Sequence, residues 1–294
     1  MAIVVGRPDG EGLIAAVDAL RDWQYEGAPM QLHPGDLGWS WRFGAGALAA
    51  AVRTWSRDGR ILALGFLDGP NLLRMTIAPD VQQDEELAWQ VAADAADPER
   101  GVLTPGEAYI EAPMQALLQD VLAEQGWQGD EPWTPLRREL TDPVKEPDLR
   151  IEVVGPEHGH GAEHVPARVA VQRAAFANST FTEEHWRVMA AGPIYAGAQC
   201  LVAYDEHAAA VAAVTVWSAG PGKPGLLEPM GVHREHRVRG YGRAITEAAA
   251  AALQKLGASS GIVCTPSANV GAVATYQAGG FEVRPEIRDM RRDA

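Results

Sequence analysis

A short turn rich in arginine and glycine, placed between an apolar run and a long helical pattern, constrains the fold most. Residues 226–232 form the apolar run, and Arg243–Leu256 carries apolar side chains at i, i+3 and i+4 spacing. Gly240 and Gly242 stand directly before that helix. Glycine lets main-chain N–H groups approach a ligand closely, and a helix start adds partial positive charge. The segment therefore predicts an α/β protein with a phosphate or pyrophosphate site at this helix start.

The charges of this turn favour the same kind of ligand. Four arginines, at positions 234, 237, 239 and 243, lie within ten residues. The turn is not a Walker A loop, because no Gly-Lys-Ser/Thr follows, and it lacks the first glycine of a dinucleotide fingerprint. A basic turn without any ligand is the alternative interpretation.

The order of the expected elements is similar in the two halves of the chain. In the first half we expect helices over 12–23 and 114–125, and strands over 50–55, 60–67 and 71–77. In the second half we expect helices over 165–178, from Thr182, over 243–256 and over 269–278, and strands over 150–154, 200–204, 209–217, 226–232 and 261–265. A stretch rich in proline and charge, residues 129–148, predicts a boundary with few contacts. The predicted division is a domain over 1–140, a linker over 141–148 and a domain over 149–294.

The charge is divided unevenly between these halves. Residues 1–148 carry 11 Lys and Arg against 25 Asp and Glu, whereas residues 149–294 carry 14 of each. This balance argues against nucleic-acid binding, which needs a basic face. No apolar run is long enough to span a bilayer, the start does not read as a secretory signal, and the two cysteines cannot form a disulfide framework. We expect a soluble cytoplasmic protein without membrane contact.

Two sequence blocks resemble one family when they are taken together. Arg237-Val-Arg-Gly240-Tyr-Gly242 is similar to the Arg/Gln-x-x-Gly-x-Gly/Ala loop of the GNAT acetyltransferase superfamily. The block Asn269-x-x-Ala-x-x-x-Tyr276-x-x-x-Gly-Phe281 resembles the ending of the same family. Both blocks occur in the family's order and on the expected elements. The resemblance covers about residues 149–294.

The resemblance implies a fold and a co-substrate. It implies two tandem GNAT-like domains in the α/β (α+β) class, each a mixed, mostly antiparallel sheet flanked by helices, with a degenerate N-terminal domain. In the C-terminal domain a central pair of strands splays apart, and acetyl-CoA inserts there as the co-substrate; no metal is implied. The residues that the resemblance assigns to acetyl-CoA binding are Met230, Val232, Arg237, Val238, Arg239, Gly240, Tyr241, Gly242, Arg243 and Asn269.

Two residues are candidates for the proton transfers. Glu228 is the only acid in its apolar strand, and Pro229 and Gly231 disfavour regular sheet beside it. The resemblance is compatible with Glu228 as the base, acting directly or through water; the alternative is a glutamate on a solvent-facing edge. Tyr276 matches the family tyrosine that protonates the leaving thiolate, and its alternative is a core tyrosine.

The first half lacks a counterpart of the arginine and glycine turn. Residues 78–86 are acidic and contain no glycine, and carboxylates there would repel a pyrophosphate. Seven of the nine tryptophans lie in this half, either as core or as the wall of an acceptor cleft. The acidic surplus either attracts a cationic acceptor or serves solubility alone.

These observations predict transfer of an acetyl group from acetyl-CoA to a primary amine of a small cationic acceptor. An aminosugar, aminoglycoside or polyamine would fit, with direct attack in a ternary complex by a monomer or homodimer. The alternatives are a mycothiol-synthase-like acetyltransferase acting on an amino-sugar thiol, and an acyl-CoA-binding sensor without turnover. Cys200 and Cys264 are interpreted as inert core thiols, and His158, His160 and His164 are not interpreted as a zinc site.

Overall fold

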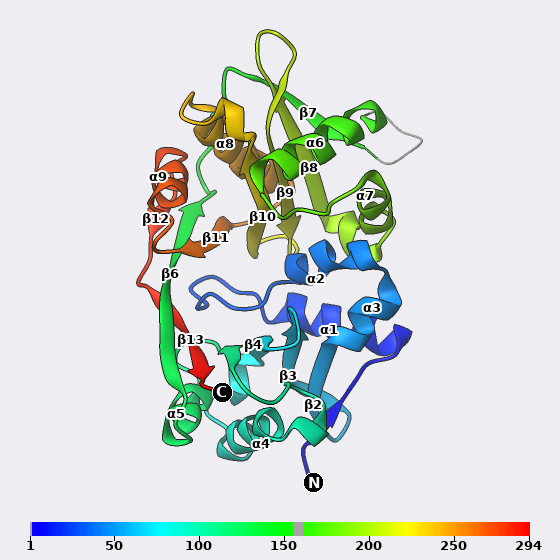
Figure 1. The fold of residues 1–294 in the computed structure, drawn as a ribbon, viewed down its shortest axis with the longest axis vertical. Coiled ribbons are helices and arrows are strands. Elements are labelled where there is room, and N and C mark those ends of the chain that lie inside the picture. The colour runs from blue at the N-terminus through cyan, green and yellow to red at the C-terminus, as the bar shows by residue number, and fades with distance from the viewer. Residues whose placement is uncertain (1, 156–160) are drawn as a thin grey trace.

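A single sheet runs through both halves of the chain (Figure 1). The computed structural model describes residues 2–155 and 161–294. Within these residues the strand order is β1-β2-β3-β4-β5-β13-β6-β11-β10-β9-β8-β7, with β12 paired to β6 beside this path. The pairs β4–β5 and β10–β11 are parallel, and the remaining pairs are antiparallel. Each half thus has one parallel pair in a mostly antiparallel sheet, which confirms the predicted fold class.

The first half contains helices that the sequence analysis did not anticipate. Its helices are α1 (Gly10–Asp22), α2 (Pro34–Ser40), α3 (Ala45–Ala51), α4 (Glu85–Ala96) and α5 (Leu117–Glu124). Its strands are β1 (Val4–Gly6), β2 (Val52–Arg57), β3 (Arg60–Leu67), β4 (Leu72–Ile77), β5 (Ala108–Glu111) and β6 (Gln128–Glu139). The expected helix over 12–23 and hairpin at 57–59 are present, but residues 50 and 51 belong to α3 rather than to a strand.

The second half follows the expected order of elements closely. Its helices are α6 (Val165–Ala175), α7 (Glu183–Ala190), α8 (Tyr241–Lys255) and α9 (Val270–Ala278). Its strands are β7 (Arg150–Val154), β8 (Ala198–Tyr204), β9 (Ala210–Ser218), β10 (Pro224–Val232), β11 (Ser260–Pro266), β12 (Glu282–Val283) and β13 (Ile287–Arg292). Thr182 caps α7 by accepting a hydrogen bond from the main-chain N–H of His185, as predicted from its position before two acids.

The two halves exchange their last strands. Strand β6, from the first half, pairs with β11 of the second half through Thr134–Glu139 and neighbouring residues. Strand β13, from the C-terminal tail, pairs with β5 of the first half and with the start of β6. Figure 1 shows β6 and β13 side by side where the halves meet. Each half therefore needs a strand from the other to complete its sheet.

The proline-rich stretch 129–148 consequently differs from its expected structure. Its first part is the longest strand, and Pro132 and Pro135 lie within it. A proline has no N–H to donate, but both carbonyl oxygens still accept main-chain hydrogen bonds. The oxygen of Pro132 accepts from the N–H of Ser267, and that of Pro135 accepts from the N–H of Arg284. Only the part from Leu140 to Leu149 lies outside strands and helices. The predicted domain division remains a prediction, with strands that cross it.

Strands β10 and β11 part soon after they begin. They pair only at Pro224–Leu226 with Ser260–Ile262. The register of β10 against β9 then shifts between Leu227 and Met230, around the Glu228–Pro229 peptide bond, which is cis. A proline has no N–H to give to the ladder, which suits a bulge at this point. The predicted splay is therefore present.

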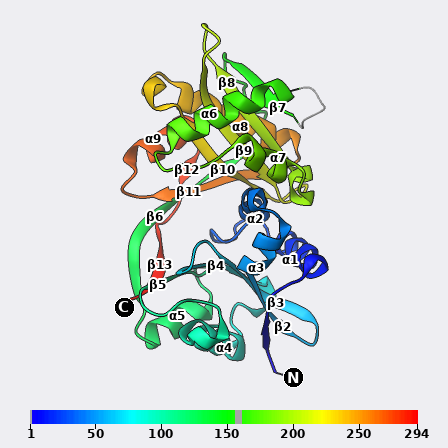
Figure 2. The same ribbon diagram turned by 45° about the vertical axis from the view of Figure 1, so that its right-hand side comes forward.

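Helix α2 of the first half lies against the sheet of the second half (Figure 2). Its glycines make this approach possible, because a Cβ added at Gly35 would lie 2.6 Å from Trp217 and one at Gly38 would overlap the same ring. His33 caps α2 and is fully buried, with Nε2 3.2 Å from the main-chain oxygen of Pro224 on β10. Burial lowers the pKa of His33 to about 4, so this contact is made by a neutral imidazole.

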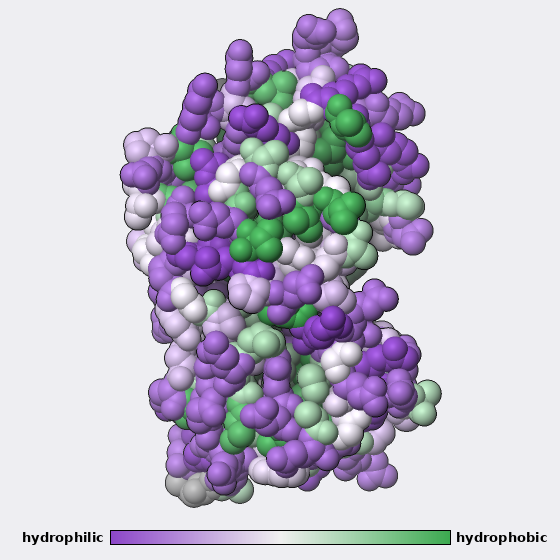
Figure 3. All heavy atoms as spheres, turned by 90° about the vertical axis from the view of Figure 1, so that its left-hand side faces the viewer, coloured by the Kyte–Doolittle hydropathy of each residue, from purple (hydrophilic) through white to green (hydrophobic). Residues whose placement is uncertain are grey.

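The face that carries α9, β6 and β13 is mainly hydrophilic, with separate small apolar groups (Figure 3). Among the described residues, no helix is both long enough and apolar enough to cross a membrane.

Candidate active site

A cavity of about 390 Å³ opens where β10 and β11 part. Its second-half wall comes from β10, β11 and the start and inner face of α9. Its first-half wall comes from the segment before α2, the β3–β4 turn, β4 and β5, and strands β6 and β13 contribute further side chains. The residues used below that line it are Asp68, Arg74, Glu111, Trp133, Glu228, Met230, Cys264, Asn269, Tyr276 and Asp289.

Glu228 faces this cavity rather than bulk solvent at a sheet edge. Burial raises the pKa of Glu228 to about 8, and the charge of Asp36 adds to the rise. Arg74 lowers the pKa of Glu228, whereas Asp68 and Glu111 raise it further. A carboxyl group with a pKa near neutrality can accept a proton and release it again at physiological pH, which suits a general base.

Behind Glu228, Arg74 joins two elements of the first half. Its Nη1 lies 2.9 Å from Oδ1 of Asp36 on α2, and its Nε donates to Oε2 of Glu111 on β5 at 2.6 Å. Arg74 and Glu111 are also register partners in the parallel β4–β5 pair. Their ion pair bridges the place in the first half that corresponds, by strand order, to the β10–β11 opening.

Tyr276 lies on α9 across the splay from Glu228. Its side chain is only 6% exposed, and its hydroxyl has no hydrogen-bond partner among the described residues. Burial raises the pKa of Tyr276 well above its ordinary value, with Glu228 and Cys264 acting in the same direction. The hydroxyl therefore keeps its proton through the whole physiological range.

Cys264 lies in the cavity wall, although it was expected in the core. Burial raises the pKa of the Cys264 thiol to about 12, so it is not a thiolate nucleophile. The same burial would raise the pKa of any other thiol bound in this cavity. A thiolate formed there would be a stronger base than in water.

Some of the residues predicted to bind acetyl-CoA reach the cavity and others lie beside it. Met230 and Asn269 line the cavity, and Asn269 caps α9 by accepting from the main-chain N–H of Ala272 at 3.2 Å. Val232 ends β10 next to Gly242, since a Cβ on that glycine would lie 3.4 Å from Val232 Cγ2.

The turn before α8 has an exposed and unusual backbone. Val238 has φ +61° and is fully exposed, and Gly240 caps α8 with φ +85°. A β-branched residue in the left-handed region is rare and is found where function retains the strain. Arg237 donates to the main-chain oxygen of Ala175 at the end of α6. That arginine thus contacts a helix end in this conformation.

Arg234 also donates hydrogen bonds to the end of α6, whereas Arg239 does not. Arg234 donates from Nε to the oxygen of Ala174 at 2.8 Å. Arg239 is exposed, and no described residue pairs with it. The main-chain groups of the turn and Arg239 therefore remain available to an anion.

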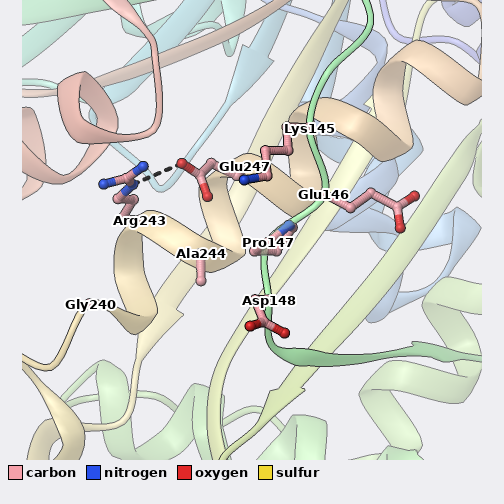
Figure 4. Close-up of a pocket in the computed structure, with 8 residues that line it drawn as sticks. All are labelled: Lys145, Glu146, Pro147, Asp148, Gly240, Arg243, Ala244 and Glu247. Atoms are coloured by element: carbon pink, nitrogen blue, oxygen red, sulfur yellow. Dashed lines mark hydrogen bonds and ion pairs between the residues drawn. The ribbon is translucent and has the colours of Figure 1, made fainter.

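Arg243 and Gly240 line a second hollow, of about 240 Å³, on the outer side of α8 (Figure 4). Arg243 donates to Glu247 at 2.8 Å. Lys145, Glu146 and Asp148 from the preceding segment complete this hollow, so its charges are mixed. It is separate from the cavity that holds Glu228 and Tyr276.

Comparisons with known proteins agree with this geometry. Residues 170–281 match the acetyltransferase (GNAT) family, over the segment that contains the splay, the turn and α9. This segment is similar to the GNAT acetyltransferases, which are acyltransferases that use acetyl-CoA as co-substrate.

Solved structures show that the whole chain has the tandem GNAT fold. A tandem GNAT protein from the clavulanic acid biosynthesis pathway superposes with a TM-score of 0.63 at 16% identity, covering 99% of this chain and 98% of that one. A GNAT protein from Sphaerobacter thermophilus gives 0.59 at 17% identity, with 99% and 95% covered. One from Colwellia psychrerythraea gives 0.60 at 14% identity, with 99% of both chains covered. No curated protein shows significant similarity to the sequence.

The corresponding helix start in the GNAT-like first half is acidic. Asp84 caps α4 with its side chain, and Glu85 and Glu86 occupy the first turn. Arg57 engages the carboxylates of both Asp84 and Glu86 at 2.9 Å. The side-chain cap occupies a main-chain donor that an anion would need, and the carboxylates would repel a pyrophosphate.

The tryptophans of the first half have mixed roles. Trp23, Trp55 and Trp127 are buried in the core, Trp89 is largely exposed, and Trp133 lines the cavity. Of the three histidines rejected as a zinc site, His158 and His160 lie outside the described residues, and His164 Nδ1 lies 2.8 Å from the Tyr204 hydroxyl.

The local sequence patterns do not reveal the first-half side of the candidate site. Asp36, Asp68, Arg74 and Glu111 belong to four separate segments, and Asp289 follows about 180 residues after the last of them. No local spacing could join them, because only the tertiary fold brings these segments together.

Proposed function

We propose that this protein transfers the acetyl group of acetyl-CoA to a primary amine of a small cationic acceptor. The observation that carries the proposal is that Glu228 and Tyr276, from β10 and α9, line one cavity at the splay. An aminosugar, aminoglycoside or polyamine fits this description. The cofactor side of the site comprises the turn 237–243, the open edge of β10 from Met230 to Val232, and Asn269.

The residues divide the chemistry between them. Beyond Leu226 the main chain of β10 has no β11 partner, so it is available to the pantetheine arm and to the thioester oxygen. Glu228, or a water that it orders, takes a proton from the acceptor ammonium. The amine then forms a C–N bond with the acetyl carbon in a ternary complex, and the C–S bond breaks.

Tyr276 completes the cycle by giving its proton to the CoA thiolate. Burial raises the pKa values of thiol and phenol together in this cavity, as Cys264 and Tyr276 both show, so the donor and the acceptor of this proton stay close in acidity. The acylated nitrogen gives up its second proton, which restores the Tyr276 hydroxyl, and Glu228 loses its proton to solvent.

The first test is calorimetric titration with acetyl-CoA, followed by an assay of CoA thiol release with small amines. We expect one site per chain, because the first half has an acidic helix start and a bridged β4–β5 pair. Two sites would contradict this account of the first half. Binding without turnover of any amine would favour the non-catalytic sensor, and no binding would remove the proposal.

A further inference from the structure

The acceptor side of the cavity carries more acid than it can neutralise internally. Asp68, Glu111 and Asp289 line it together with Glu228, and they come from the β3–β4 turn, β5 and β13. Among the described residues that line the cavity, Arg74 is the one basic side chain, and its Nη1 and Nε contact Asp36 and Glu111. Arg42, outside the lining, is close enough for its charge to act on Asp68 and Glu228, and neither arginine forms an ion pair with Asp289.

Asp289 is the clearest sign of this imbalance. Among the described residues no hydrogen bond or ion pair engages its carboxylate. Burial raises the pKa of Asp289 to about 6, and Glu111 adds to the rise. A carboxylate placed in a cavity wall without a partner is destabilised there, and a cation in the cavity would relieve that cost.

A second feature of the cavity also points to a ligand. The side chain of Tyr276 is only 6% exposed, and its hydroxyl has no hydrogen-bond partner in the part of the chain that the structure describes. Because Tyr276 lines the cavity, a polar ligand bound there could give this hydroxyl the hydrogen bond that the protein does not supply. Trp133 adds an aromatic wall, and aromatic faces attract ammonium groups.

The spacing of the carboxylates favours an organic cation over a metal ion. Within the described residues, no three His, Cys, Asp or Glu side chains come close enough to hold a metal. The acids instead surround a cavity of about 390 Å³. An extended molecule with more than one cationic group matches charges that are distributed in this way.

We propose that the first half and β13 bind a second ammonium group of the acceptor. The preferred acceptor is then a small diamine or diamino sugar, with one amine beside Glu228 and the other held by Glu111 and Asp289, with Asp68 at the rim and Trp133 alongside. This inference rests on the proposed function. Strands from both ends of the chain then select the acceptor.

The test compares matched acceptors that differ in one amine. The pairs are 1,4-diaminobutane with n-butylamine, and 2,6-diamino-2,6-dideoxyglucose with glucosamine. With acetyl-CoA saturating, we expect kcat/KM to be at least tenfold higher for the diamine of at least one pair. We expect Asp289→Asn to reduce that ratio at least fivefold while the Kd for acetyl-CoA is unchanged. Asp120→Asn, an exposed acid on α5 outside the cavity, is the matched control and leaves the ratio unchanged.

The outcomes separate the two proposals. If the monoamines are acetylated as well as the diamines, the proposed function stands and the second-cation site is wrong. If no amine is acetylated although acetyl-CoA binds, the proposed function fails. The second-ammonium site is then tested by calorimetric titration of the CoA-loaded protein with the same amines. Equal affinity for diamine and monoamine in that titration shows that the second-ammonium site is wrong. Loss of the diamine preference on adding EDTA would show a metal site instead.

Discussion

Trp217 on β9 donates a hydrogen bond of 2.6 Å from Nε1 to the main-chain oxygen of Glu228 on β10. The bond spans the point where the register between these strands shifts. The same indole is covered by Gly35 and Gly38 of α2, which belongs to the first half. Helix α2, from the first half, thereby supports the main chain that carries the candidate base.

This relationship predicts that a substitution remote from the cavity lowers the rate. Gly38→Ala places a methyl group in the Trp217 ring, which must shift. Overpacking of this kind costs about 1–3 kcal/mol of stability, and a displacement of about 1 Å at a reacting group costs on the order of 10²-fold in rate. We expect kcat to fall tenfold or more, measured by thiol release.

Gly46→Ala is the matched control for that variant. Gly46 lies in α3, and nothing stands within 4 Å of an added Cβ. Alanine is the better helix former, so this variant keeps full activity and is as stable as the parent. A fully active Gly38→Ala protein would show that α2 does not support Glu228.

Replacing the candidate base should slow the reaction without weakening the binding of acetyl-CoA. For Glu228→Gln we expect kcat/KM for the amine to fall by about 10²–10⁴, because general-base assistance is lost. The Kd for acetyl-CoA, measured by calorimetry, should stay within about twofold. Glu282→Gln, an exposed acid on β12, is the control. Equal rates for both variants would remove Glu228 from the mechanism.

The pH dependence follows from the raised pKa of Glu228. The base must be ionised to act, so kcat/KM should rise with pH through a midpoint near 8 rather than near the ordinary 4.5. Glu228→Gln removes this midpoint and leaves only the titration of the acceptor amine. Activity that is constant between pH 6 and 9 would contradict the assignment.

Stability should change in the opposite direction over the same range. The folded state holds the Glu228 proton more tightly than the unfolded chain, so folding is favoured at low pH and loses this contribution as pH rises from about 4.5 to 8. Relative to Glu228→Gln, the parent should therefore lose stability across this window, as measured by urea unfolding.

The tyrosine variant tests the acid step. Tyr276→Phe removes a buried hydroxyl that has no partner in the described structure, so the fold should tolerate it. We expect kcat to fall at least tenfold while acetyl-CoA affinity changes little. A variant that retains the parental kcat would instead make Tyr276 a packing residue of α9.

The arginines around the turn should separate binding from stability. Arg239→Met removes an exposed cation that pairs with no described residue. It should lower the affinity for acetyl-CoA about tenfold, which is the contribution of one charge-assisted hydrogen bond. Arg234→Met removes the bonds to the end of α6. It should lower Tm more than it weakens acetyl-CoA. Equal effects of both variants on affinity would contradict this division.

Local patterns in the sequence were sufficient to predict the main elements of the second half. The helix over 243–256 has a strong apolar periodicity, Pro229 and Gly231 disfavour a regular ladder, and Asn269 is a natural cap. These signals lie within a few residues of one another, so elements α8, β10 and α9 could be predicted from them. Glu228 and Tyr276 could be selected because each stands in such a local pattern.

The first half was harder to predict because its short elements depend on tertiary contacts. Helix α2 has two glycines and little periodicity, and its burial against Trp217 stabilises it. Strand β6 contains Pro132 and Pro135, and it is a strand because β11 and β13 pair with it. Such partners overrule local propensity, which is why a boundary was predicted there.

The sequence by itself indicated the GNAT resemblance, the turn rich in arginine and glycine, and the two candidate residues for proton transfer, because these signals lie in short continuous segments. Only the tertiary structure decided what surrounds them. Asp36, Arg74 and Glu111 reach Glu228 because the halves exchange strands and α2 packs across the junction. The pKa of Glu228 and the acidic acceptor wall are consequences of that packing, since burial and charge depend on neighbours that are distant in the chain.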